Sequence, residues 1–220
     1  DRAPEKDERP AVAWATAKLL NDQTDKKALE RLRRLESREA KDALKYIQRG
    51  QDMIFIDIPY IHQAHNHCGI SSATMTLRHQ GEPVSQFQVK RHCPGSGWAE
   101  GAYWTDLLLA AKHFEKNWAI ETYRVTDKDF ETGKRFLLSE LNAGRPVIID
   151  WLEDLESRSA HSIVLCGYDE TAKEYYFKDP ALTFPGIRVR SEEDFRNVWR
   201  SIGFVADNRI LKRALIRIVP

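Results

Sequence analysis

Residues 1–50 carry apolar side chains at helical spacing, with charged side chains between them. Leucine and isoleucine recur through this region with few helix breakers, which is the pattern of amphipathic helices. The polar stretch at residues 21–25 interrupts it, so we predict two helices, the second capped by Thr24 or Asp25 and ended by Gly50. We interpret the region as an N-terminal helical extension that packs on the domain or mediates a helical contact. A pro-segment that covers a functional site is the alternative.

From residue 51 onward the pattern becomes a mixture of helical spacing and short apolar runs. It predicts helices at residues 68–80, 84–90, 103–115, 127–142 and 191–200, and strands at residues 53–60, 119–125, 147–151, 162–168, 174–178, 187–190 and 213–219. Helices dominate the first part and strands the second, which indicates an α+β fold rather than alternating βαβ units. We therefore expect one domain at residues 51–220 behind the helical extension.

Composition narrows the possible partners. The chain has 220 residues and a net charge of +1 from 34 basic and 33 acidic side chains. This balance gives no electrostatic case for nucleic acid or an anionic membrane as a partner. No apolar run reaches the roughly 18 residues of a membrane-spanning helix. We expect no nucleic-acid partner, no membrane span and no cofactor.

The three cysteines argue against a disulfide scaffold, because an odd count leaves at least one free thiol. Cys166 lies in an apolar run and is expected in the core. Cys93, in a glycine-rich loop, stays ambiguous. The start at Asp1 is compatible with a removed signal peptide, so the compartment is left open.

Cys68 is the candidate nucleophile, because it follows a polar stretch and begins a predicted helix. The positive end of the helix dipole favours the thiolate there. Gly69 permits close approach of a substrate backbone. The Cys68 N–H and the Gln63 side-chain amide are candidate donors to an oxyanion. The alternative is a buried helix cysteine and a surface glutamine.

His161 and Asp179 are the candidate base and orienting acid. If the hairpin between them turns at Glu170, residues 161 and 179 oppose each other on one face, with Cβ atoms about 5 Å apart. A carboxylate in that position holds the imidazole and stabilises the imidazolium. A surface pair is the alternative. Nucleophile, base and acid in this order indicate a cysteine hydrolase.

Aromatic residues flank the expected site. The candidate substrate-binding residues are Trp98, Trp104 and Gly69, the last through contact with the substrate backbone. Tyr103 and Trp151 are further candidates for lining a cleft. Packing in the core is the default interpretation for the aromatic residues. Asp150 and Glu153 are candidates for binding basic groups, although a solvated loop is the simpler interpretation.

Histidines near the candidate nucleophile raise a metal site as a rival. The side chains concerned are His62, His65, His67 and Cys68, with His79, His92 and Cys93 downstream. Imidazole and thiolate are good zinc ligands. No CxxC or HExxH pattern is present, however, and the spacing fits no standard zinc motif. We therefore expect no metal.

Together these motifs resemble the papain-like cysteine peptidases of the C39 and C39-like family. The resemblance covers about residues 53–182 and is carried by residues 58–63 (Ile-Pro-Tyr-Ile-His-Gln), 68–69 (Cys-Gly), 144–148 (Gly-Arg-Pro-Val-Ile), 161–164 (His-Ser-Ile-Val), 167–169 (Gly-Tyr-Asp) and 179–180 (Asp-Pro). It implies a papain-like fold with Cys68 as nucleophile, His161 as base, Asp179 as orienter and Gln63 as oxyanion donor. The chain departs from the family pattern in two ways: four residues separate Gln63 from Cys68, and a histidine, His67, precedes the cysteine.

Three functions follow from these residues. The first is a cysteine peptidase that acts on a peptide or protein substrate and forms an acyl-enzyme thioester. The second is an amidase or acyltransferase that uses the same three side chains. The third is a non-catalytic domain that binds a peptide.

Overall fold

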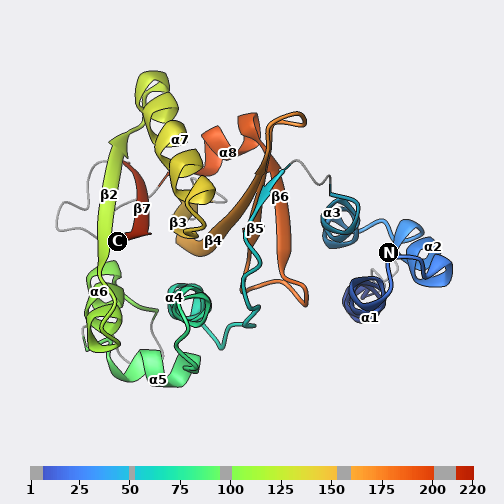
Figure 1. Cartoon of the computed structure of the whole chain (residues 1–220), viewed down its shortest axis with the longest axis horizontal. Helices are drawn as coiled ribbons and strands as arrows, with labels where there is room; N and C mark the ends of the chain where they lie inside the picture. The colour runs from blue at the N-terminus through green and yellow to red at the C-terminus, as the bar shows by residue number, and fades with distance from the viewer. Residues whose placement is uncertain (1–6, 50–52, 95–100, 153–159, 201–211) are drawn as a thin grey trace, which may run out of the picture.

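An antiparallel sheet lies at the centre of the structure, a computed structural model that describes residues 7–49, 53–94, 101–152, 160–200 and 212–220. The strand order is β2-β7-β3-β4-β5-β6, and β1 pairs with β4 outside this path (Figure 1). The strands are β1 (Ile54–Phe55), β2 (Trp118–Arg124), β3 (Val147–Leu152), β4 (Ala160–Asp169), β5 (Glu174–Lys178), β6 (Ile187–Ser191) and β7 (Lys212–Ile218).

Helices cover the sheet from two sides and from one edge. They are α1 (Arg9–Asn21), α2 (Lys26–Arg33), α3 (Arg38–Ile47), α4 (Cys68–His79), α5 (Gln86–Arg91), α6 (Trp104–His113), α7 (Asp127–Asn142) and α8 (Glu192–Val198). In Figure 1, α4, α5 and α6 lie below the sheet, α7 and α8 lie above it, and α1–α3 lie beside β6. The fold is α+β with an antiparallel sheet, as predicted. Within the described residues, no helix is both long and apolar enough to span a membrane.

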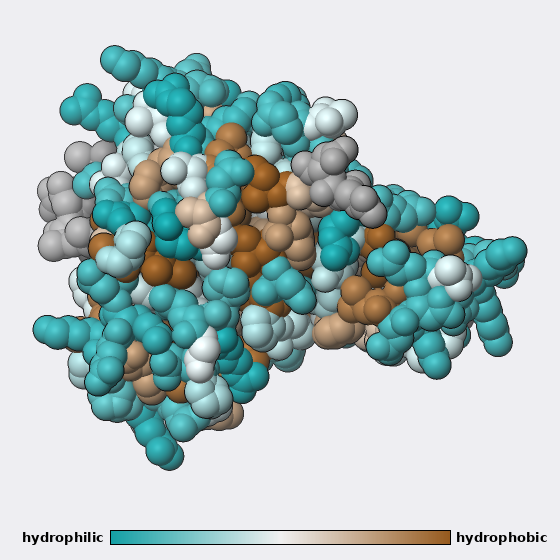
Figure 2. Space-filling view, viewed as in Figure 1, coloured by the Kyte–Doolittle hydropathy of each residue, from teal (hydrophilic) through white to brown (hydrophobic). Residues whose placement is uncertain are grey.

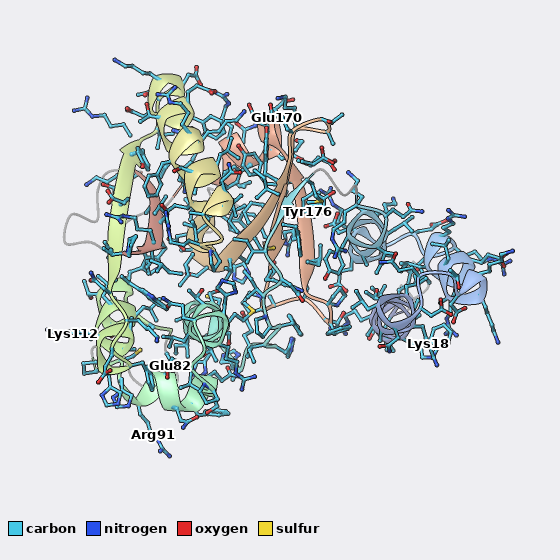
Figure 3. All side chains as sticks on the ribbon, viewed as in Figure 1. Lys18, Glu82, Arg91, Lys112, Glu170 and Tyr176 are labelled. Atoms are coloured by element: carbon cyan, nitrogen blue, oxygen red, sulfur yellow. The ribbon has the colours of Figure 1, made fainter. Side chains whose placement is uncertain are left out.

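The main core lies between the sheet and its helices. Every residue of β3 is buried, and nine consecutive residues of α4, Gly69 to Leu77, are buried as well. Burial on all sides explains why these elements appear in the sequence as nearly continuous apolar or small-residue runs. Figure 2 shows apolar side chains over the centre of this body and also on the N-terminal helices. In Figure 3 the labelled Lys112, Arg91 and Glu170 lie at the periphery, whereas Tyr176 lies inside and is 3% exposed.

The N-terminal region forms three helices rather than the two predicted. Asp25 caps α2 as expected, accepting a hydrogen bond from the Ala28 N–H at 2.9 Å. A second break follows, where the Ser37 side chain accepts from the Ala40 N–H and begins α3. These helices bury a small apolar cluster of their own, composed of Val12, Ala15, Leu19, Ala28, Leu32, Ala40 and Ala43.

The β4–β5 hairpin is formed, but its predicted register was wrong. Val164 opposes Lys178, and the register shifts between Leu165 and Gly167 because β4 holds one extra residue, Cys166. Such a bulge changes the pairing by one residue. His161 therefore lies beyond the paired part of β5 and opposes Trp151 of β3. Cys166 is fully buried, as predicted.

Candidate active site

Cys68 is the first residue of α4, at the end of the helix that points into the candidate site. It is partly exposed, whereas Cys93 and Cys166 are buried. Burial raises the pKa of the Cys93 thiol to about 12 and that of the Cys166 thiol to about 12. Of the three thiols, Cys68 is therefore the one placed to react with a molecule from solution.

His161 joins the sulfur to a carboxylate. Its Nε2 lies 2.8 Å from Oδ1 of Asp179, and its ring also forms a hydrogen bond with the Cys68 side chain. Burial alone would lower the pKa of His161, but the bonds to Asp179 and Cys68 outweigh it and raise the pKa to about 10. With its pKa raised, the His161 ring holds a proton and a positive charge beside the Cys68 sulfur.

Asp179 follows directly after β5 and is fully buried. Its Oδ1 also accepts from the Ala181 N–H at 2.9 Å, and its Oδ2 accepts from Nε of Arg188 at 2.7 Å. Burial would raise the pKa of Asp179, but the bond and charge of His161 and the charge of Arg188 keep it below its usual range. A buried carboxylate with these partners is a fixed negative charge for the imidazolium.

Arg188 is a site residue that the sequence reasoning missed. It lies on β6 opposite Phe177 of β5, and its guanidinium is 5.6 Å from the Trp151 ring centroid. The available signal was an arginine inside a strand with buried neighbours, since Ile187 and Val189 are both buried. A buried charge needs a partner, and Asp179 is that partner.

The turn that carries Asp179, residues 179–186, is held by the segment before Cys68. The turn closes with a 2.7 Å bond from the Asp179 N–H to the Gly186 carbonyl. The Tyr60 hydroxyl donates to the Leu182 carbonyl, and the Gln63 N–H donates to the Pro180 carbonyl at 2.9 Å. The sequence segment that signals the site thus packs against the turn that supplies its carboxylate.

Gln63 lies beside this turn, in the region where an oxyanion donor was predicted. Its side-chain Oε1 is buried and has no hydrogen-bond partner among the described residues. The backbone on either side of Gln63 is held by Gln86. The Gln86 Oε1 accepts from the Ala64 N–H at 2.9 Å, and its Nε2 donates to the His62 carbonyl at 3.1 Å. Sequence reasoning missed Gln86, because its role depends on a contact across more than twenty positions.

A cavity of about 300 Å³ lies next to the sulfur. The residues around it include Cys68, Gly69, Tyr103, Trp104, Asp150 and Ser162. On its polar wall, Nε1 of Trp104 donates to the Ser162 hydroxyl at 3.4 Å, and that hydroxyl lies 3.5 Å from Oδ1 of Asp150. Gly69 and Trp104 therefore line the cavity, whereas Trp98 lies outside the described residues.

The other candidates divide between core and surface. Trp151 is fully buried and packs on Phe177 with ring centroids 5.3 Å apart, so the default interpretation of a core residue holds. Glu153 lies outside the described residues. In the part of the chain that the structure describes, no three histidine, cysteine or acidic side chains are grouped to hold a metal ion. His79 instead contacts the Gly144 carbonyl at 3.1 Å.

Comparison with known proteins gives the family. Residues 55–207 match the model of the Peptidase_C39 like family. The chain therefore belongs to this family of cysteine peptidases. No curated protein sequence matches it at a significant level.

Two solved structures with TM-scores above 0.5 show the same fold. A double glycine motif protease from an AMS/PCAT transporter, in complex with its leader peptide, has a TM-score of 0.51 at 24% identity, covering 76% of this chain and 94% of that one. UfSP from C. elegans has a TM-score of 0.51 at 10% identity over 77% of this chain and 34% of that one. The peptidase domain of Streptococcus ComA, a bifunctional ABC transporter, has a TM-score of 0.49 at 15% identity over 73% and 96%. The predicted papain-like fold is confirmed.

Proposed function

We propose that this protein hydrolyses peptide bonds with Cys68 as nucleophile, His161 as base and acid, and Asp179 as the orienting carboxylate. One observation carries the proposal: a single imidazole bonds both the partly exposed thiol and a fully buried carboxylate. This is the geometry of a nucleophile, a base and an orienting group. The family of the chain supports the same chemistry.

The reaction proceeds through a thioester. The Cys68 thiolate attacks the carbonyl carbon of the scissile peptide bond and gives a tetrahedral oxyanion. The His161 imidazolium then transfers its proton to the leaving amine as the C–N bond breaks, which leaves the acyl group on sulfur. Neutral His161 next takes a proton from water as the resulting hydroxide attacks the thioester carbonyl. The C–S bond of that tetrahedral intermediate then breaks, which releases the acid and restores the thiolate beside the His161 imidazolium.

The oxyanion requires two donors near the sulfur. The Cys68 N–H belongs to the first turn of α4 and has no partner within the helix, so it is the first donor. The Gln63 side-chain amide is the second. This assignment is supported by the position of the Gln63 backbone, whose N–H donates to the Pro180 carbonyl in the same turn that carries Asp179.

The cavity beside the sulfur would receive a side chain of the substrate. A volume of about 300 Å³ is large enough for one amino-acid side chain next to the scissile bond, by comparison with ligand pockets of about 300–1,000 Å³. The indole of Trp104 supplies an apolar wall, and Gly69 leaves room for the substrate backbone. Peptides are therefore the proposed substrate class, and a leader peptide is the one bound by the structural relative.

Profiling with a peptide library tests the proposal directly. The native chain should cleave a subset of peptides, and Cys68→Ala should cleave none while keeping the same melting temperature. Adding an amine separates hydrolysis from the amidase and acyltransferase alternative, because transfer would give an amide product. A lack of any product, together with Cys68 alkylation no faster than that of a free thiol, would favour the peptide-binding alternative.

A further inference from the structure

The N-terminal helices contact β6, the strand whose Arg188 binds the candidate carboxylate of Asp179. β6 is the last strand in the sheet order, and α3 packs along its free edge (Figure 1). An edge strand presents N–H and C=O groups that no neighbouring strand pairs. At Val189, α3 supplies both partners: Arg38 donates to the carbonyl at 2.8 Å, and Asp42 accepts from the N–H.

The two α3 side chains form a paired unit. Nε of Arg38 lies 3.2 Å from Oδ1 of Asp42, and Asp42 is 2% exposed. Burying a carboxylate is unfavourable unless hydrogen bonds and a cation compensate. Burial raises the pKa of Asp42, and the bond from the Val189 N–H together with the charge and bond of Arg38 offsets that rise in part. This contact is therefore specific, and it fixes the backbone of one residue of β6.

That residue is adjacent to the arginine of the candidate site. Arg188 precedes Val189 and donates from Nε to Oδ2 of Asp179 at 2.7 Å. The other carboxylate oxygen bonds His161 at 2.8 Å. A continuous series of bonds thus runs from α3 through β6 and Asp179 to the imidazole.

A second contact reaches the turn at residues 179–186 directly. The Thr183 hydroxyl donates to Oε2 of Glu39 at 3.0 Å. Glu39 is also on α3, so one helix holds both the strand after the turn and the turn itself. None of residues 7–49 lines the cavity beside Cys68.

We propose that the N-terminal helices are a positioning unit for the triad carboxylate, acting through Arg38, Asp42 and Glu39 of α3. The inference rests on the proposed function, because it assigns the role to the same site. It gives residues before the family-matched range 55–207 a part in the reaction. Hydrogen-bond partners of metal ligands change activity about 10-fold to 100-fold when they are removed, and we expect a loss at the low end of this range for groups that position Asp179 through Arg188.

The test uses the full chain with side-chain changes at the contact. Arg38→Met removes the donor to Val189, and Thr183→Val removes the donor to Glu39. The double variant should lower kcat by about 10-fold with KM nearly unchanged. It should also move the alkaline limb of the rate profile to lower pH, because a less well placed carboxylate stabilises the imidazolium less. Arg38→Lys should restore part of the rate.

Glu30→Gln is the matched control. Glu30 forms an exposed ion pair with Arg34 at 3.8 Å in the same group of helices, and among the described residues neither side chain bonds to β6. The control should match the native chain in rate and in pH profile. Equal losses in the control and in the double variant would overturn the inference, and so would an unchanged profile in a folded double variant.

A thermodynamic cycle with Arg188 tests the route of the coupling. If the effect passes through Arg188, then Arg38→Met should add little to Arg188→Met. Fully additive losses would contradict the route. Melting temperatures of all variants identify any loss that comes from unfolding alone.

Alkylation separates this inference from the proposed peptidase function. Cys68 reacts with iodoacetamide whether or not a peptide is cleaved, and its rate against pH reports on the imidazole. A shifted alkylation profile in the double variant, without peptide cleavage by the native chain, would support positioning and defeat the peptidase proposal. Cleavage by the native chain with an unshifted profile would do the opposite.

Discussion

The two halves of the candidate site are built by different means. Cys68 takes its position from local structure, since it begins α4 directly after a loop. His161 and Asp179 take theirs from long-range structure, namely a bulged hairpin, a turn and the neighbouring strand β6. The comparison teaches that the position of a candidate nucleophile can be predicted from a local pattern, whereas the positions of its candidate partners depend on strand register. Changes on the two sides should therefore have different signatures.

Removing the sulfur should have the largest effect. Cys68→Ala is expected to lower kcat/KM by about 10⁵-fold or more, since no nucleophile remains. His161→Ala should cause a loss of similar size, because the two act as one unit. Both variants should stay folded. Hydrolysis of a library-derived peptide and circular dichroism check this, and either variant at native activity would contradict the assignment.

Asp179→Asn should lower the rate less than loss of the sulfur, by about 10²-fold to 10⁴-fold, because the ring keeps other contacts. It also changes the dependence of stability on pH. The folded pKa of His161 is about 10, and an unfolded histidine titrates near about 6.5. The protonated ring therefore stabilises the fold fully below about pH 6.5, and this contribution is lost as the pH rises through 10.

Melting curves measured between about pH 6 and pH 10 check the linkage. The melting temperature of the native chain should fall over this range, and that of Asp179→Asn should fall less. Parallel curves would mean that the carboxylate does not hold the proton on His161.

Gly186→Ala should disturb the long-range half of the site through its turn. Gly186 has a φ of +66°, and a Cβ there would lie 2.2 Å from the Tyr60 ring. We expect a destabilisation of about 3 kcal/mol, from backbone strain together with overpacking. Gly81→Ala is the matched control, because its φ of +89° is also left-handed but no atom lies within 4 Å of its Cβ. Denaturant unfolding should show the smaller cost, about 1–2 kcal/mol, at Gly81.

Trp104→Phe should have the smallest effect. It keeps the apolar wall of the cavity and removes the Nε1 donor to Ser162. We expect KM to rise by about 5-fold with kcat nearly unchanged, because one neutral hydrogen bond contributes about 1 kcal/mol. Initial rates across substrate concentrations distinguish this from a loss in kcat, which would place the indole in the chemical step.

Much of the fold follows from sequence because local signals agree with packing. Helix α7 has the predicted bounds, residues 127–142, with Thr126 as its cap. The break before α3 was missed because Ser37 caps without a capping box: the third helical residue is Ala40, where a glutamate or glutamine would give the signal. The predicted strand at residues 53–60 is reduced to Ile54–Phe55. The Ile56 N–H still donates to the Cys166 carbonyl of β4, whereas Tyr60 contacts the turn at residues 179–186.

The candidate site divides in the same way. The contact between His161 and Asp179 was anticipated, although the register used to derive it was wrong. Asp169 pairs with Glu174, so the turn is centred between Thr171 and Ala172 rather than at Glu170, and the bulge at Cys166 then shifts the pairing by one residue. Arg188 and Gln86 were missed because each acts through a partner from another element. A single sequence contains no record of such pairs.

The capping of Val189 by Arg38 and Asp42 has a consequence for solubility. These side chains occupy the hydrogen-bonding groups on which another β-strand would otherwise add. A chain shortened to begin after α3 would present an open sheet border next to buried apolar residues of β6. Such a fragment should self-associate through strand addition at β6. In the full chain, α3 would prevent this by covering that edge of the sheet.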